Sequence, residues 1–157
     1  MSVKNSYPEL PEIHFKRTSV EMALVIIFAK SLIGKYQKEH LRMAYAIFRN
    51  ESANGSRGVN NNFGGIQGDC GRWKNLPSNP IATSVKVDSG GVARRFLCFN
   101  ESDGYKVSFE LFCIKARDRN MVTSTDYFAK WVSNPNPSFA AIQSFNNLLN
   151  SGAKIFP

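Results

Sequence analysis

Apolar residues recur at helical spacing near the start of the chain. Thr18 and Glu21 have the spacing of a capping box, and an apolar run follows them. The apolar positions of this run are Val20, Ala23, Leu24, Ile27 and Phe28. A cap followed by positions at i, i+3 and i+4 predicts a buried helix that ends near Gly34.

A second helical stripe begins near Lys38 and leads to a glutamate. Its apolar positions are Leu41, Ala44, Tyr45 and Phe48, and the next position in this row is Glu51. A carboxyl group in line with an apolar stripe loses hydration, and the helix C-terminus adds negative potential. Both effects favour the protonated form, which a general acid requires. The alternative is that the helix end frays and Glu51 points into water.

Asparagine and glycine dominate residues 54 to 68, a composition typical of a loop. Phe63 and Ile66 lie inside this polar segment, so we expect them to pin the loop to the core. Asn and Gln amides carry both donors and acceptors, which suit sugar hydroxyls and N-acetyl groups. The loop is therefore a candidate sugar-binding segment.

The rest of the chain predicts one hairpin and three further helices. Residues 81–99 alternate around an Asp-Ser-Gly-Gly turn, which indicates a β-hairpin. Residues 105–117 fit a strand or a helix, and their length and basic end favour a helix. Residues 125–133 and 138–150 are apolar segments opened by Ser or Thr caps. The sum is an α+β, mainly helical fold with a small β-hairpin lobe.

Length and charge narrow the class of protein. The 157 residues suit a single domain, with residues 1–17 as an N-terminal arm packed over it. Lys+Arg 20 against Asp+Glu 12 gives a net charge of +8, which indicates an anionic partner. Nucleic acid, anionic lipid and the bacterial wall all qualify. The basic residues are neither clustered nor interleaved with aromatics, so nucleic acid is disfavoured.

No segment predicts export or a membrane span. The N-terminus has no apolar core of a signal peptide. The apolar stretch 20–33 is interrupted by Glu21 and Lys30 and is shorter than the roughly 20 residues that a span needs. We therefore expect a soluble protein without a general export signal.

Three cysteines lie far apart in the sequence, at Cys70, Cys98 and Cys113. The last two lie in apolar runs, and no Cys-x-x-Cys pair occurs. Buried free thiols are expected, with no disulfide framework and no metal site.

The order of these features resembles the lysozyme-like peptidoglycan hydrolases. The match is strongest to the bacterial endo-β-N-acetylglucosaminidase family of autolysins and flagellar-rod muramidases. Glu51-Ser52 matches the Glu-Ser that ends the family's helix. Residues 60–68 read NNNFGGIQG and resemble the family's Asn-Asn-x-Phe-Gly-Ile-Lys-Gly segment, with an extra Gly and with Gln in place of Lys. The resemblance spans roughly residues 20–133, and its specific part is 44–68.

The resemblance implies roles for individual residues. Glu51 would be the catalytic acid. Asp88 would be a second catalytic carboxylate in the hairpin, although an Asp at this position also suits a plain turn. Tyr127 would be the active-site tyrosine of the family's late segment and a substrate-binding residue, with a core position as the alternative. The residues expected to line the sugar cleft are Asn61, Asn62, Phe63 and Gln67.

The implied activity is a bacteriolytic glycosidase that cleaves the β-1,4 bond between N-acetylmuramic acid and N-acetylglucosamine. One alternative is a lytic transglycosylase, which uses a single Glu and leaves 1,6-anhydro-muramyl ends. Another is a non-catalytic wall-binding or virion structural protein. No metal or cofactor is implied, and we expect a monomer bound to peptidoglycan glycan strands. A wall substrate without a signal peptide predicts a phage product or an effector of a specialised secretion system.

Overall fold

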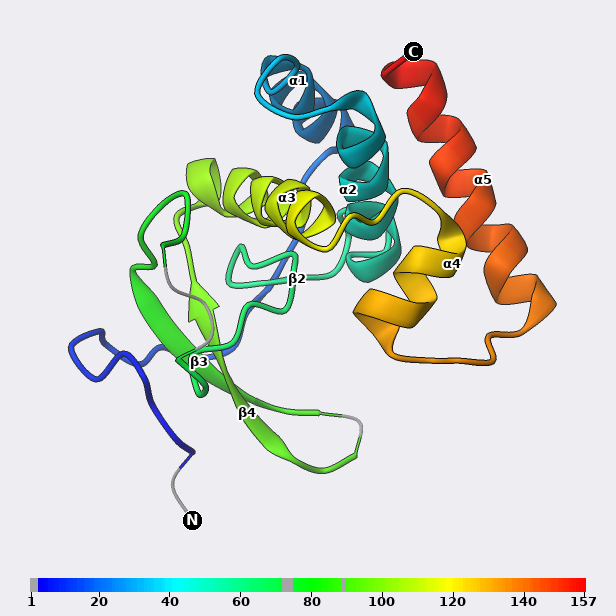
Figure 1. The fold of residues 1–157 in the computed structure, drawn as a ribbon. Helices are drawn as coiled ribbons and strands as arrows, with labels where there is room; N and C mark the ends of the chain where they lie inside the picture. Colours follow the sequence, from blue (N-terminus) through cyan, green and yellow to red (C-terminus); the bar gives the residue numbers. More distant parts are fainter. Residues whose placement is uncertain (1–2, 72–74, 89) are drawn as a thin grey trace.

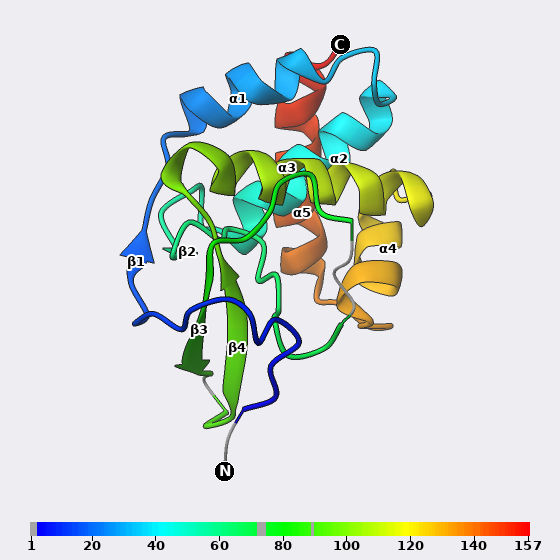
Figure 2. The ribbon, with the colours of Figure 1, turned by 90° about the vertical axis from the view of Figure 1, so that its left-hand side faces the viewer.

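The computed structural model of the protein describes residues 3–71, 75–88 and 90–157. Helices dominate an α+β fold, as the sequence predicts, and a hairpin projects away from them (Figures 1 and 2). The helices are α1 (Met22–Ser31), α2 (Lys38–Glu51), α3 (Glu101–Asp118), α4 (Ser124–Asp126), the π-helical η1 (Tyr127–Val132) and α5 (Phe139–Ile155). The strands are β1 (Arg17–Thr18), β2 (Gly58–Val59), β3 (Ala82–Val87) and β4 (Ala93–Cys98). The antiparallel pairs are β1 with β2 and β3 with β4.

Helix α2 forms the centre of the core and packs against both α3 and α5 (Figure 1). Its predicted stripe is confirmed, because Leu41, Ala44, Tyr45 and Phe48 are all buried. The Phe48 ring lies 5.7 Å from the Phe63 ring, centroid to centroid. The loop that follows α2 is therefore pinned to the core, as its apolar residues predict.

Helix α1 differs from the prediction in its cap and in its buried face. Its N-cap is Glu21, which makes no side-chain cap hydrogen bond, so the predicted capping box is wrong. Thr18 instead lies in β1, where its hydroxyl accepts a hydrogen bond from the Asn61 amide at 2.8 Å. The helix packs on α3 with one face only, which leaves Leu24 48% and Ile27 68% exposed. The expectation that these two residues are buried is wrong.

The β3–β4 hairpin and the N-terminal arm are tied together by a buried arginine. The hairpin is confirmed, with Val87 opposite Ala93, and residue 89 of the predicted turn lies outside the described residues. Arg95 donates to the Glu12 carboxylate at 2.5 Å and to the Thr83 hydroxyl at 2.9 Å. It also donates to two arm carbonyls. The described part of the arm therefore packs over the hairpin.

Of the two predicted C-terminal helix starts, the one at Ser138 is confirmed, and the one at residue 125 is wrong because Thr123 caps that helix two residues earlier. The ambiguous segment is helical and begins at Glu101. Thr123 and Asp126 form a capping box at the start of α4, which continues directly into η1. Ser138 caps α5, which extends beyond its predicted end to Ile155.

The three cysteines are free thiols, as expected, with Cys98 and Cys113 buried and Cys70 partly buried. In the described parts of the chain, no helix has the length and apolar character needed to cross a membrane.

Candidate active site

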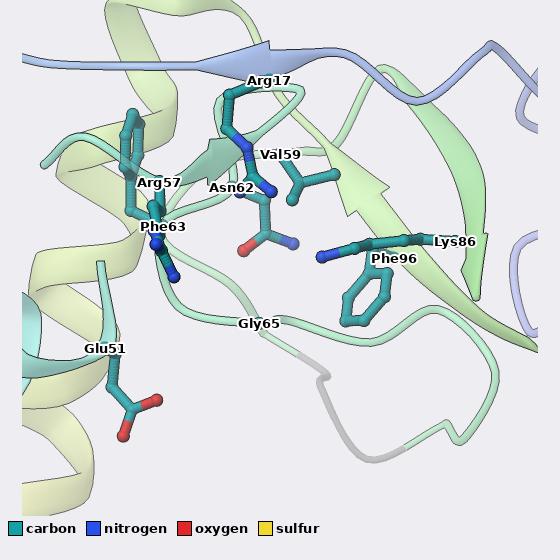
Figure 3. Close-up of a pocket in the computed structure, with 9 residues that line it drawn as sticks. All are labelled: Arg17, Glu51, Arg57, Val59, Asn62, Phe63, Gly65, Lys86 and Phe96. Carbon is teal, nitrogen blue, oxygen red and sulfur yellow. The ribbon is translucent and has the colours of Figure 1, made fainter. Parts of the chain in front are cut away.

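Glu51 lies at the edge of a pocket of about 280 Å³ between the end of α2 and the hairpin (Figure 3). The lining residues are Arg17, Glu51, Arg57, Val59, Asn62, Phe63, Gly65, Lys86 and Phe96. They come from the arm strand β1, the segment around β2, the Asn/Gly loop and both hairpin strands. The fold thus joins Glu51 to the two parts of the sequence that the motif connected, the loop and the β lobe.

Tyr127 holds one oxygen of Glu51. Its hydroxyl donates to Glu51 Oε1 at 2.9 Å, and Asn50 Nδ2 donates to the same hydroxyl at 2.9 Å. The tyrosine ring is buried and stacks on Phe145 at 3.9 Å between centroids. Burial and the negative charge of Glu51 raise the pKa of Tyr127 well above its usual range, so the hydroxyl stays a donor.

The π-helical turn places this tyrosine. Tyr127 is the first residue of η1, directly after the capping box that fixes the start of α4. Wide π-helical turns are rare and are frequent at functional sites. Tyr127 is therefore both a core residue and the partner of Glu51, so the two alternatives raised by the sequence are not exclusive.

The other oxygen of Glu51 is open to a ligand. No donor among the described residues bonds to Oε2. The side chain is exposed, so the expectation that the apolar stripe desolvates it is wrong. Helix α2 ends at Glu51, and among the described residues Tyr127 of η1 hydrogen-bonds to only one of its two oxygens.

Asn62 lines the pocket, but its amide is engaged in holding the loop. Its Nδ2 donates to the carbonyls of Ile66 and Leu97, each at 2.9 Å. Its Oδ1 accepts from the amides of Gly64 and Ile66. The side chain therefore fastens the loop to β4 and fixes the wall of the pocket.

The other predicted cleft residues lie in different places. Phe63 lines the Glu51 pocket and is buried against Phe48. Asn61 lines a separate pocket beside α1 and donates to the Phe99 carbonyl at 3.0 Å. Its backbone is left-handed, with φ 64°. Gln67 lines neither of these two pockets, and its Oε1 accepts a hydrogen bond from the Cys70 thiol.

Asp88 lies in the hairpin turn and does not line the Glu51 pocket. Its Oδ1 accepts from the amides of Gly90 and Val92, each at 2.9 Å, and Arg94 approaches Oδ2 at 3.4 Å. The hydrogen bond from Val92, above all, lowers the pKa of Asp88. These contacts are those of a turn-forming aspartate.

Three basic residues at the pocket escaped the sequence analysis. Arg17, Arg57 and Lys86 belong to three separate segments, so no local motif connects them. The pairing of Arg17 with Val59 across β1 and β2 brings the arm to the pocket. Within the described ranges, no cluster of His, Cys, Asp and Glu is suited to hold a metal ion.

No protein-family model, curated protein or solved structure matches this chain. Any assignment of function therefore depends on the residue pattern together with the geometry around Glu51.

Proposed function

We propose that the protein cleaves the glycan strand of bacterial peptidoglycan, with Glu51 as the proton donor. The observation that carries the proposal is the state of this carboxyl group. One oxygen accepts a hydrogen bond from Tyr127, the other has no hydrogen-bond donor among the described residues, and the residue lines a pocket. A fixed carboxyl group with one free oxygen at a pocket suits proton transfer to a glycosidic oxygen.

The bound substrate contributes to this chemistry. A glycan strand over the pocket would cover the exposed carboxyl group and exclude water from the reacting atoms. Proton transfer from Glu51 to the leaving oxygen then breaks the bond to C1 of the sugar. Tyr127 orients the carboxyl group through its hydrogen bond and does not touch the reacting atoms.

The position of Asp88 favours a single-glutamate route after that step. Glu51, now ionised, would remove the proton from the muramyl 6-hydroxyl, whose oxygen bonds to C1 and closes the anhydro ring. Water is neither consumed nor released, and the second carboxylate of a hydrolase is not needed. Hydrolysis would instead require a water activated by a group such as Asp88.

Asp88→Asn is expected to change the rate of wall lysis by less than about threefold, because Asn keeps the oxygen that accepts from Gly90 and Val92. Loss of a true general base would cost about 10²-fold or more. The initial rate of turbidity loss of purified sacculi measures the difference. A loss on that larger scale, with an unchanged unfolding transition, would restore Asp88 as the base.

Tyr127→Phe is expected to lower the lysis rate about tenfold or more, because the hydrogen bond that orients the Glu51 carboxyl group is lost. The stacking on Phe145 remains, so the fold should be kept. Tyr105→Phe is the matched control, since no described residue hydrogen-bonds to its hydroxyl. Equal rates for the two variants would remove Tyr127 from the account.

A further inference from the structure

The pocket beside Glu51 carries a concentration of positive charge. Arg17 comes from β1, Arg57 from the residue before β2, and Lys86 from β3. Figure 3 shows the nitrogen ends of Arg17 and Lys86 directed toward the same part of the pocket, near Asn62. Arg57 points into the space between them and Glu51. Three distant segments thus supply cations to one concave surface.

These three cations have no carboxylate partner among the described residues. Within residues 3–71, 75–88 and 90–157, none of the three has an Asp or Glu oxygen within 4.0 Å. Other arginines of the β lobe are paired, with Arg94 beside Asp88 and Arg95 beside Glu12. Like charges gathered in one pocket repel each other, and an anion bound among them relieves that repulsion.

An aromatic ring orders two of the three cations before any ligand binds. The Arg17 guanidinium and the Lys86 ammonium each lie 5.4 Å from the centre of the Phe15 ring. Such cation–π contacts restrict the freedom of long basic side chains. A ligand that meets side chains already held in place loses less free energy to ordering.

We propose that this pocket binds an anionic group of the ligand. This inference rests on the proposed function, under which the ligand is a glycan strand that carries carboxylates. The pocket would therefore bind muramyl residues in preference to plain N-acetylglucosamine. The carboxylate can come from the lactyl ether of a muramyl residue or from its peptide stem.

The test measures binding without turnover, by isothermal calorimetry on the Glu51→Gln protein. Three tetrasaccharides are compared: alternating N-acetylglucosamine and N-acetylmuramic acid without peptides, the same strand with peptide stems, and neutral chitotetraose. At least one of the two anionic strands is expected to bind about tenfold more tightly than chitotetraose at low salt, and to lose this advantage as salt rises. Whichever strand shows the advantage identifies the source of the carboxylate. Equal binding of all three, or no binding, would overturn the proposal.

Matched variants distinguish the effect of the pocket cations on binding from the effect of the protein's net charge. In the same background, Arg57→Gln with Lys86→Gln is expected to abolish the preference for anionic strands. The double variant Lys30→Gln with Lys154→Gln removes the same charge from exposed positions outside the pocket. It should still bind anionic strands more tightly than the neutral one. Lys86→Arg, which retains the charge, should also keep this preference. Equal losses in the two double variants, with unfolding transitions unchanged, would contradict a specific site.

Failure of the pocket proposal and failure of the proposed function would give different results. If the anionic strand binds through Arg57 and Lys86 but the unsubstituted protein cleaves no wall, the pocket is retained and the catalytic proposal falls. If the wall is cleaved and no preference for anionic strands exists, the catalytic proposal is retained and the pocket proposal falls.

Discussion

Glu51→Gln is expected to abolish the lysis of purified cell walls, with a loss of about 10²- to 10⁴-fold, the range for removal of a general acid. Gln has the same shape as Glu, and its amide oxygen can still accept the hydrogen bond from Tyr127. The proton donor alone is removed. Turbidity loss of a suspension of sacculi gives the rate, and thermal unfolding checks that the fold is unchanged.

Glu9→Gln is the matched control for this variant, because it removes one exposed carboxylate from the N-terminal arm. It should lyse walls at the rate of the unsubstituted protein. A Glu51→Gln protein that keeps more than a few per cent of the activity would show that another group donates the proton.

Phe48→Ala is expected to lower the free energy of unfolding by about 3–5 kcal/mol, as large-to-small changes in a packed core do. Phe48 is fully buried and its ring contacts the rings of Phe63, Phe109 and Phe112. Urea unfolding followed by circular dichroism measures the loss. Since Phe63 also lines the Glu51 pocket, the loop should loosen and the lysis rate should fall as well.

Phe139→Ala removes the same side chain from a position that is 79% exposed. Its effect on the free energy of unfolding should stay within about 0.5 kcal/mol, as for most surface substitutions. Similar losses in both variants would contradict the assignment of Phe48 to the centre of the core.

Elements defined by local patterns could be predicted from the sequence. The stripe of α2 reads at helical spacing, and α5 starts at the Ser138 cap that the sequence shows. The start of α1 could not be read in this way. Thr18 pairs with Gly58 across β1 and β2, and this long-range pairing removes it from the capping position. A pairing between segments about forty residues apart leaves no local signal.

The candidate site was only partly visible in the sequence for the same reason. Glu51 and Phe63 lie in one short segment, and the motif connects them. The resemblance also named Tyr127, but not its hydrogen bond to Glu51, which lies 76 residues away. The basic residues come from three segments that no motif connects. Asn61 and Asn62 are adjacent and have the same side chain, so the sequence does not distinguish them. In the structure Asn61 has a left-handed backbone, and of the two only Asn62 lines the Glu51 pocket.

Mass spectrometry of the material released from purified sacculi tests the central claim most directly. We expect soluble muropeptides with a newly cut glycan bond, and none of them from the Glu51→Gln protein. The position of Asp88 favours anhydro-muramyl ends, lighter by one water than the hydrolysed product. Hydrolysed ends would be consistent with the proposed glycosidase activity, but the second step would then use an activated water in place of the muramyl 6-hydroxyl. Sacculi whose glycan bonds stay intact with the unsubstituted protein would contradict the account.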